Sequence, residues 1–426
     1  MPPVILAALL AIVLLAAPAV AAAATEPREE PAPKLNAATW LLVDPTDGEE
    51  LAAHAPDRER AIASTTKLMT AYLALKKLRM GEKLEVPAYS AGAAESVAGL
   101  VEGERLTVHD LIVAMMLPSA NDAAETVAEG ISGSKRAFVS LMNRTAADLG
   151  LDRTHYANPI GLDAKGNYST AADLTDLASK LLSDKRIRKI VSKPQATLKS
   201  GAERRVVTNT NTLLLSDPSV DGVKTGHTLD AGYVLVASAK RDTVPLLAAV
   251  LGAPSEADRD AGAEALLDYG YSLYEHRNAV RKGERAASAT VRYEDENLPL
   301  LAKRPIAVSI RPDQDLRIDV GGPEQVEGPI ATGDRLGQVT VTLDGKFVGR
   351  TPLVAGRDVD EPTVIDRIGG PLVAALIVIV LIVIIAAVAF ALRRRHRASS
   401  DSERDPEERM RTRHERIRRR RGGDGE

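Results

Sequence analysis

The stretch that decides the fold is AIASTTKLMT, residues 61–70. It places Ser64 three residues before Lys67, where small residues pass into the helical pattern STTKLMTAYLALKKL. Residues three apart on a helix share a face, with Cβ atoms ~5–6 Å apart. A serine becomes a good nucleophile when a base takes its proton, and a lysine can do so once burial or a nearby cation lowers its pKa. Two interpretations compete: an ordinary helix start with a surface lysine, or a nucleophile with its base.

The Ser-x-x-Lys spacing is weak evidence by itself, because both residue types are common. The chain repeats it in ISGSKR, where Ser132 precedes Lys135 in a Gly/Ser turn with no apolar helix behind it. We interpret that second pair as a chance occurrence. The pair at Ser64 therefore needs support from other segments.

A second segment, LPSAND, places Ser119 and Asn121 after the apolar run LIVAMML and a proline. Taken alone, such a pattern more often ends one helix and begins the next. In the catalytic interpretation, the hydroxyl of Ser119 relays a proton and the amide of Asn121 holds a substrate carbonyl. The segment by itself leaves both interpretations open.

A third segment, GVKTGHT, begins a predicted strand. Lys224 offers a fixed positive charge, Thr225 and Thr228 offer hydroxyls for a carboxylate, and Gly226 permits close approach of a ligand to the backbone. The tripeptide KSG at residues 199–201 shows that K-[ST]-G also recurs by chance. The three segments in this order are more specific than any one of them.

Composition narrows the possible functions. The 426 residues are 45% hydrophobic and 27% charged, and the formal net charge of −3 argues against a general polyanion binder. The chain has no cysteine, which excludes thiol nucleophiles, disulfides and thiolate metal sites. Its seven histidines form no H-E-x-x-H or H-x-x-E-H pattern, so zinc peptidase chemistry is not expected. Neither a metal nor a cofactor is predicted.

Two apolar segments lie outside any soluble core. Residues 4–17, followed by the small residues of PAVAAAA, indicate a signal peptide over residues 1–24. Residues 371–392 carry no charge, and as a helix they would span roughly 33 Å, enough for a bilayer core of about 30 Å. The sequence RRRHR follows, and the positive-inside rule places that end in the cytoplasm. We therefore expect a single-pass protein of the cell membrane whose main domain is extracytoplasmic.

Strands at both ends of the main domain enclose a helical region. ATWLLVDPTDGEELAAHAP predicts two strands and a turn, and AGYVLVASAKRDTVPLLAAVLG predicts two more strands. Between them, LTVHDLIVAMML predicts a helix with Thr107 and Asp110 placed as a capping box, and AADLTDLASKLL predicts another. SEADRDAGAEALLDYGYSLY predicts a closing amphipathic helix. The pattern indicates an α/β fold whose sheet is built from distant parts of the chain.

A strand-rich region, with IAVSIRP, LRIDV and GQVTVTLDGKFVG, predicts a separate small β domain. The tail holds 13 Arg against 8 Asp and Glu, and we expect it to be disordered and lipid-facing rather than a nucleic-acid site. The predicted order is signal peptide 1–24, linker 25–37, catalytic domain 38–276, β domain 280–356, linker 357–370, transmembrane helix 371–392 and basic cytoplasmic tail 393–426.

The three motifs, 55 and 105 residues apart, form the signature set of the penicillin-recognising serine enzymes. The flanking text, including NPIGLDAKGNYSTAADLTDLA, NTNTLL and VDGVKTGHT, resembles the D-alanyl-D-alanine carboxypeptidases, the low-molecular-mass penicillin-binding proteins, from about residue 36 to 275. Residues 280–355 resemble that family's C-terminal β domain. The resemblance implies a β-lactamase/transpeptidase-like domain: an antiparallel sheet with helices on both sides and an inserted helical region.

The resemblance also implies a role for each motif residue. Ser64 would attack the carbonyl between the last two D-alanines of a peptidoglycan stem peptide, Lys67 would act as general base, and Ser119 would pass the proton to the leaving amine. The backbone N–H groups of Ser64 and His227 would form an oxyanion hole. β-Lactam antibiotics would be inhibitors. The substrate-binding residues would be Asn121, Lys224, Thr225, Gly226 and Thr228.

Two positions depart from the family's usual pattern: Ala120 replaces a glycine, and Asn167 replaces a histidine before YSTA. Both changes are expected to be tolerated.

Two other functions are possible. A class A β-lactamase needs a glutamate that activates the deacylating water, and the corresponding region here carries ANPIGLD instead. A non-catalytic wall-binding membrane protein would not need all the motif residues. The preferred prediction is a serine-type D-Ala-D-Ala carboxypeptidase.

Overall fold

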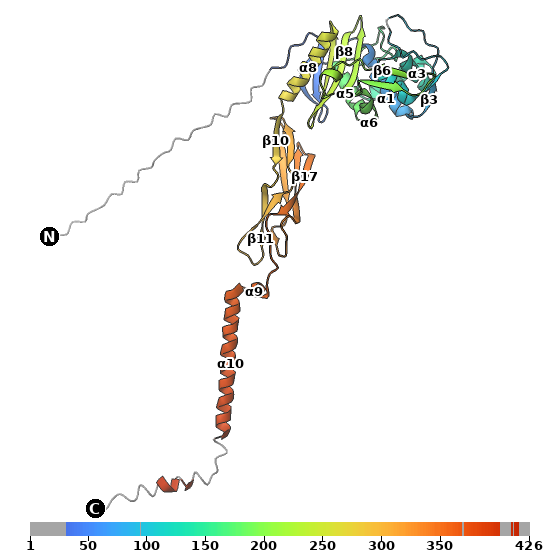
Figure 1. Ribbon diagram of the computed structural model, residues 1–426. Helices are drawn as coiled ribbons and strands as arrows, with labels where there is room; N and C mark the ends of the chain where they lie inside the picture. Colours follow the sequence, from blue (N-terminus) through green and yellow to red (C-terminus); the bar gives the residue numbers. More distant parts are fainter. Residues whose placement is uncertain (1–30, 94, 369, 401–409, 412, 417–426) are drawn as a thin grey trace, which may run out of the picture. The chain divides into compact units, whose positions relative to one another are not determined.

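The computed structural model describes residues 31–93, 95–368, 370–400, 410–411 and 413–416 (Figure 1). The chain divides into two compact units, Met1–Glu275 and His276–Glu426. The predicted signal peptide and most of the predicted basic tail lie outside the described residues. Each unit is described separately below.

The first unit is built on a five-stranded antiparallel sheet in the order β2-β1-β9-β8-β7. Its neighbouring strands come from both ends of the unit, as β1 pairs with β9 and Trp40 lies opposite Val250. This confirms the prediction of one sheet built from distant segments. The strands are β1 (Thr39–Asp44), β2 (Glu49–His54), β7 (Val220–Thr228), β8 (Gly232–Arg241) and β9 (Val244–Ala253).

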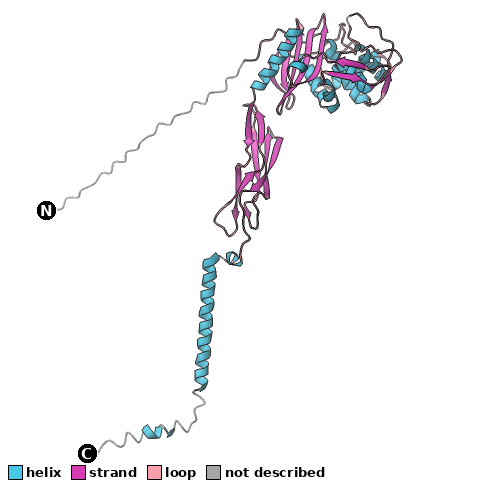
Figure 2. Ribbon diagram, in the orientation of Figure 1, coloured by secondary structure: helices cyan, strands magenta, loops and turns pink. Residues whose placement is uncertain are grey.

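The sheet is covered on both faces because its strands are apolar on both faces. Successive side chains of a strand point to opposite sides. In β8, Val234 and Val236 join the core of the helical region, whereas Leu235 and Ala237 pack with α8 (Glu256–Ser272). Figure 2 shows helices flanking the strands of this unit. The predicted α/β fold with an antiparallel sheet and helices on both sides is confirmed.

The helical region is inserted between β2 and β7, as predicted, and it carries the larger hydrophobic core. Two short antiparallel pairs, β3 (Lys83–Glu85) with β4 (Arg105–Thr107) and β5 (Gln195–Leu198) with β6 (Arg205–Thr208), border it. Its helices are η1 (Ala63–Thr66), α1 (Lys67–Lys77), α2 (Val108–Met116), α3 (Asn121–Ser132), α4 (Lys135–Asp148), α5 (Ala171–Leu182), α6 (Lys185–Val191) and α7 (Leu213–Ser216).

The predicted capping box of α2 is only half formed. The Asp110 N–H donates to Thr107 Oγ1 at 3.2 Å, as expected of an N-cap. The reciprocal bond is replaced, because Thr107 N donates to Ser200 Oγ at 3.0 Å. The Asp110 carboxylate instead accepts from the backbone N–H groups of Lys199 and Ser200 at 2.8 and 2.7 Å. The Asp110 carboxylate therefore binds the turn at Lys199 and Ser200 instead of the backbone of its own N-cap residue.

The second unit begins with strands that form a two-stranded sheet, β10-β13, and a six-stranded sheet in the order β14-β16-β17-β12-β11-β15. Alternating residues such as Val339, Val341 and Leu353 form its separate core. Its strands are β10 (Glu275–Val280), β11 (Arg285–Val291), β12 (Leu298–Ala302), β13 (Ile306–Ile310), β14 (Leu316–Gly321), β15 (Gln325–Val326), β16 (Arg335–Leu343) and β17 (Lys346–Ala355).

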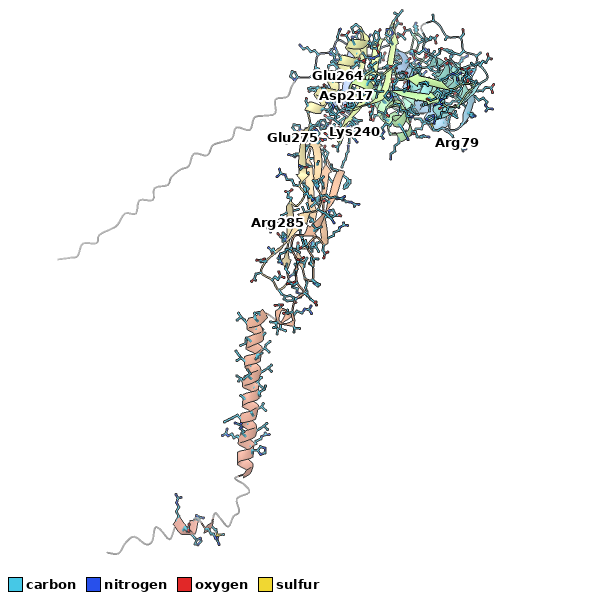
Figure 3. The ribbon with its side chains drawn as sticks, viewed as in Figure 1. Arg79, Asp217, Lys240, Glu264, Glu275 and Arg285 are labelled. Atoms are coloured by element: carbon cyan, nitrogen blue, oxygen red, sulfur yellow. The ribbon has the colours of Figure 1, made fainter. Side chains whose placement is uncertain are left out.

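After a short helix, α9 (Val364–Arg367), the described chain continues as α10 (Gly370–Ser400). Residues Gly370–His396 are long and apolar enough to cross a membrane, and none of the window tested is buried. In the view of Figure 3, side chains project from both edges of α10. The helix contains the whole predicted span 371–392, which agrees with the expected C-terminal transmembrane helix.

Candidate active site

Ser64 and Lys67 are brought together by a tight helical turn. Ser64 lies in the 3₁₀ turn η1, and Lys67 is the first residue of α1. A 3₁₀ turn has three residues per turn, so side chains at i and i+3 lie directly above one another. Lys67 Nζ lies 2.9 Å from Ser64 Oγ. Ser64 is a partly exposed residue, whereas Lys67 is fully buried.

The surroundings of Lys67 favour its neutral form. Burial lowers its pKa well below the usual value, and the positive charge of Lys224 lowers it further. The charges of Glu95, Glu125 and Asp122 oppose this shift, and the lowering prevails. Lys67 Nζ also donates to the carbonyl oxygen of Ile160 at 2.5 Å. The amine is therefore held beside Ser64, and its lowered pKa favours the neutral form that a general base needs.

The segment that supplies this carbonyl presses closely on η1. Gly161 has φ +92°, and a Cβ there would stand 2.0 Å from the Ala63 carbonyl oxygen. Only glycine fits such a contact in this backbone conformation. Asn158 Oδ1 accepts from Gly161 N at 2.6 Å and from Ile160 N at 3.2 Å, which holds the turn. The segment NPIG, residues 158–161, thus places the Ile160 carbonyl where it binds the Lys67 amine.

Ser119 and Asn121 lie where α2 gives way to α3. Ser119 has φ +68°, an uncommon conformation for a non-glycine residue. It is 7% exposed, and its Oγ has no hydrogen-bond partner among the described residues. A buried hydroxyl without a partner is costly, so it is ready to bond an incoming group. Asn121 is buried at the start of α3, and its Nδ2 donates to Glu95 Oε2 at 2.8 Å.

The Lys-Thr-Gly motif lies on β7, an edge strand of the sheet, beside η1. A Cβ on Gly226 would stand 3.0 Å from the backbone nitrogen of Ser64, so a larger residue would require the strand or the turn to shift by a few tenths of an ångström. Lys224 is 1% exposed and donates to Thr225 O at 2.8 Å. Burial, with the charge of Arg259, lowers the pKa of Lys224 to about 7.

A threonine that the motif search did not select joins β7 to the Ser119 turn. Thr210 donates from its backbone nitrogen to Leu117 O at 3.1 Å, and its Oγ1 lies 2.5 Å from Thr225 Oγ1. Its segment, NTNTLL, was noticed only as part of the family resemblance. Thr210 therefore links the β7 strand, which lies beside η1, to the turn that carries Ser119.

The remaining predicted residues lie at the exposed end of β7. Thr228 is partly buried, and its Oγ1 accepts from Ala231 N at 3.2 Å. The His227 ring is exposed and stacks on Tyr233 with centroids 4.0 Å apart. This ring is therefore occupied in a structural contact, which leaves the His227 backbone N–H as the group of interest.

The second Ser-x-x-Lys pair differs from the first in its surroundings. Ser132 ends α3 and Lys135 begins α4, so a helix boundary separates them. The Lys135 side chain is 53% exposed and its Nζ lies 2.7 Å from Oε1 of the buried Glu125. It is a structural lysine, which agrees with the interpretation of this pair as a chance match.

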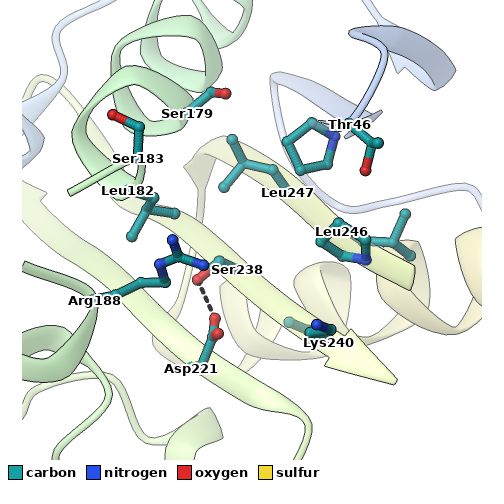
Figure 4. Close-up of a pocket in the computed structure, with 13 residues that line it drawn as sticks. Thr46, Ser179, Leu182, Ser183, Arg188, Asp221, Ser238, Lys240, Leu246 and Leu247 are labelled. Carbon is teal, nitrogen blue, oxygen red and sulfur yellow. Dashed lines mark hydrogen bonds between the residues drawn. The ribbon is translucent and has the colours of Figure 1, made fainter. Parts of the chain in front are cut away.

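A separate cavity of about 320 Å³ lies on the same sheet but contains none of the predicted site residues (Figure 4). Asp221 and Ser238 lie in its wall, and the serine hydroxyl donates to the carboxylate at 2.5 Å. Arg188 and Lys240 also contribute to the lining. The chemistry-bearing motifs gather elsewhere.

Comparison with known proteins agrees with this geometry. Residues 24–255 match the D-alanyl-D-alanine carboxypeptidase family, and residues 274–361 match the C-terminal domain of penicillin-binding protein 5. The chain is 31% identical over 332 residues to the D-alanyl-D-alanine carboxypeptidase DacF of Bacillus subtilis, covering 76% of this chain and 85% of that protein. It is also 31% identical over 352 residues to DacA of Escherichia coli, covering 79% and 87%.

Solved structures give the same result. Penicillin-binding protein 5 from Haemophilus influenzae matches with a TM-score of 0.55 at 30% identity, covering 78% of this chain and all of that one. The DD-transpeptidase of Streptomyces K15 matches with a TM-score of 0.54 at 32% identity, covering 57% of this chain. The first family match alone spans more than half of the sequence. The chain therefore belongs to the D-alanyl-D-alanine carboxypeptidase family of serine peptidases.

Proposed function

We propose that this serine peptidase removes the terminal D-alanine from peptidoglycan stem peptides ending in D-Ala-D-Ala, through an acyl-enzyme on Ser64. The observation that carries the proposal is the position of the Lys67 amine. Lys67 is fully buried, and its Nζ lies 2.9 Å from the hydroxyl of the partly exposed Ser64. Family membership supports the substrate class.

Acylation needs a base, an oxyanion site and a proton donor. Lys67 Nζ takes the Ser64 hydroxyl proton while Oγ attacks the carbonyl of the penultimate D-alanine. The backbone N–H groups of Ser64 and His227 are the proposed donors to the oxyanion. The proton then passes through the Ser119 hydroxyl to the leaving nitrogen. The peptide bond breaks, D-alanine leaves, and the rest of the peptide remains as an ester of Ser64.

Substrate recognition falls to the residues around this bond. The second N–H of the Asn121 amide would donate to the peptide carbonyl preceding the scissile bond. Lys224, Thr225 and Thr228 would bind the carboxylate of the terminal D-alanine, and Gly226 leaves room for the substrate backbone beside Ser64. A carboxylate bonded to a protonated lysine is a strong, charge-assisted contact. This arrangement favours peptides that end at the D-alanine being released.

The cycle closes when water adds to the ester carbonyl, the bond to Ser64 Oγ breaks, and the serine recovers its proton. A β-lactam would acylate the same oxygen, because its ring amide resembles the scissile peptide. Opening that ring keeps the leaving nitrogen attached to the acyl group, so the adduct is retained.

We also propose the placement predicted from the sequence: residues 1–24 direct export, the catalytic unit lies outside the cell membrane, and residues 371–392 anchor it with the Arg-rich tail in the cytoplasm. The apolar helix Gly370–His396 supports membrane anchoring. Orientation is testable by protease protection in intact spheroplasts. Cleavage of the catalytic unit from outside, with the tail protected, is expected; a tail digested from outside would reverse the topology.

The function is tested by D-alanine release from a peptide ending in D-Ala-D-Ala, comparing the detergent-solubilised wild type with Ser64→Ala. Release by the wild type alone establishes both activity and nucleophile. If a folded wild type releases no D-alanine but turns over penicillin quickly, the enzyme is a β-lactamase. If it does neither, both enzymatic functions are contradicted, and a non-catalytic wall-binding protein is the remaining alternative.

A further inference from the structure

Glu95 makes a contact with the candidate site that no motif indicates. It lies in the connection between β3 and β4, and its Oε2 accepts from Asn121 Nδ2 at 2.8 Å. The hydroxyl of Tyr89 donates to the same oxygen, and Gly92 N donates to Oε1 at 2.9 Å. Three donors from three residues thus hold one carboxylate against the amide of the Ser-x-Asn motif.

The chemistry of this contact fixes the direction of the amide. An ionised carboxylate can only accept hydrogen bonds, whereas an asparagine side chain carries an acceptor on one side and two donors on the other. The amide nitrogen of Asn121 must therefore face Glu95. One of its N–H groups is used there, and we assign the other to the substrate carbonyl. Without Glu95, the amide could turn over and present its oxygen instead.

The carboxylate itself is kept ionised for this task. Burial opposes ionisation of Glu95, but hydrogen bonds from Tyr89, Asn121 and Gly92 outweigh it and hold its pKa below the usual value. Lys67 is the charged group facing it across the site, and its charge acts in the same direction. Burial and the bond to Glu95 raise the pKa of Tyr89, so that hydroxyl keeps its proton and remains a donor.

We propose that Glu95 is a positioning residue for catalysis: it orients the Asn121 carboxamide so that a free N–H faces the substrate carbonyl. The inference rests on the proposed function of Asn121. Glu95 touches neither Ser64 nor Lys67 by hydrogen bond among the described residues, and it acts through Asn121.

The surrounding chain holds the connection in place without Glu95. The Asp122 carboxylate accepts from Ala98 N and Leu100 N, each at 3.0 Å, and Asn121 N donates to Ser96 O at 2.7 Å. Loss of the Glu95 side chain should therefore free the amide of Asn121 while the backbone stays anchored. Substitution at Glu95 is for that reason an interpretable test.

The test is a double-mutant cycle between Glu95→Ala and Asn121→Ala on the full chain in detergent, with D-alanine release giving kcat and KM. Glu95→Ala is expected to lower kcat/KM by about 10- to 100-fold, since hydrogen bonds to charged groups are strong. In the Asn121→Ala background the same change should cost less than about threefold, because the amide to be oriented is gone. An equal loss in both backgrounds would overturn the proposal.

Two variants separate orientation from structure. Glu95→Gln can still accept through its carbonyl oxygen, so it should recover most of the rate lost in Glu95→Ala. Glu102→Ala, an exposed carboxylate in the same connection, is the matched control and should match the wild type. A Glu95→Gln enzyme as slow as Glu95→Ala would contradict the hydrogen-bond argument. Should Glu95→Ala fail to fold, the cycle is run with Glu95→Leu.

The proposed function is tested separately by labelling the wild type with a fluorescent penicillin at Ser64. Absence of labelling would remove the catalytic role on which the inference rests. Labelling of the wild type, with Glu95→Ala labelled at the same rate as Glu102→Ala, would refute the role of Glu95 alone.

Discussion

Gly226 lies so close to Ser64 that a Cβ on the glycine would stand 3.0 Å from the Ser64 nitrogen. They are 162 positions apart in sequence and come from an edge strand and a 3₁₀ turn. The contact joins the proposed carboxylate-binding strand to the proposed nucleophile and oxyanion donor. Small shifts at this junction should therefore affect the rate more than the stability.

Gly226→Ala is the direct test of that junction. The added methyl must displace η1 or β7 by a few tenths of an ångström, which misaligns the Ser64 N–H, and loss of an oxyanion donor costs up to about 10²–10³ in kcat. We expect penicillin acylation to slow by about 10- to 100-fold, with a small change in the melting temperature. Gly262→Ala on α8 is the control, because its Cβ would meet only ordinary contacts, the nearest 3.6 Å away. Equal acylation rates for the two variants would contradict the account.

Two lysines with the same Ser-x-x-Lys spacing should separate chemistry from stability. Lys67→Met should lower D-alanine release by about 10²–10⁴-fold, the usual contribution of a general base. The pKa of Lys67 is lower in the folded state than in the unfolded state, so the unfolded chain binds this proton more tightly. At pH values below the ordinary lysine pKa, Lys67 therefore lowers the free energy of unfolding. Lys67→Met should therefore unfold at the same or a higher temperature at pH 7.

Lys135→Met is the matched control and should show the opposite pattern. It leaves the buried Glu125 carboxylate without its 2.7 Å partner, which we expect to cost about 1–3 kcal/mol. Activity at 25 °C should stay near the wild-type value. Thermal unfolding and D-alanine release, measured on both variants, check the pair. A more stable Lys135→Met or a fully active Lys67→Met would contradict the assignment.

Ser119 offers a third test, because its hydroxyl is buried without a partner and its backbone has φ +68°. Ser119→Ala removes a buried hydroxyl without a partner, so the variant should be at least as stable as the wild type, while acyl transfer slows by about 10²-fold or more through loss of the proton relay. Ser119→Gly should relax the left-handed backbone and stabilise the fold by about 1 kcal/mol, with the same loss of rate. Chemical denaturation and stopped-flow acylation give the two quantities. A Ser119→Ala enzyme of normal rate would remove the relay from the mechanism.

The pH profile tests Lys224. Its ammonium must be protonated to bind a carboxylate, and burial lowers its pKa to about 7 in the free protein. We therefore expect kcat/KM to decline at alkaline pH with an apparent pKa well below that of an ordinary lysine. The corresponding apparent pKa for kcat should be higher, because a bound carboxylate favours the charged form of Lys224. Arginine keeps its charge, so kcat/KM of Lys224→Arg should show no alkaline decline up to pH ~10. An unchanged decline in Lys224→Arg would assign it to another group.

Much of this site follows from local sequence rules. The spacing of Ser64 and Lys67 indicates a shared face. The nearly continuous apolar residues of β8 and β9 fit a sheet buried on both sides, although helices on both sides were expected only from the family resemblance. The 3₁₀ geometry of the turn was not predicted, since STTKLM also fits an ordinary α-helix. The 3₁₀ turn aligns the two side chains along the helix axis more closely than an α-helix would.

Other features depend on contacts between distant residues. Glu95 lies 26 positions before Asn121 in an irregular connection with no fixed spacing, so no pattern pairs them. Asp110 was predicted to close a capping box, yet its carboxylate binds a turn 90 positions away at Ser200. Local patterns identify which groups carry chemistry, whereas the loops that orient those groups become visible only in the folded chain.

The most direct measurement is the mass and position of the adduct formed with benzylpenicillin. Because ring opening loses no atoms, the full chain should gain the whole mass of the antibiotic, and peptide mapping should place it on Ser64. Ser64→Ala should gain no mass under the same conditions. An adduct on any other residue, or D-alanine release that persists in Ser64→Ala, would contradict the assignment of Ser64 and Lys67 as nucleophile and base.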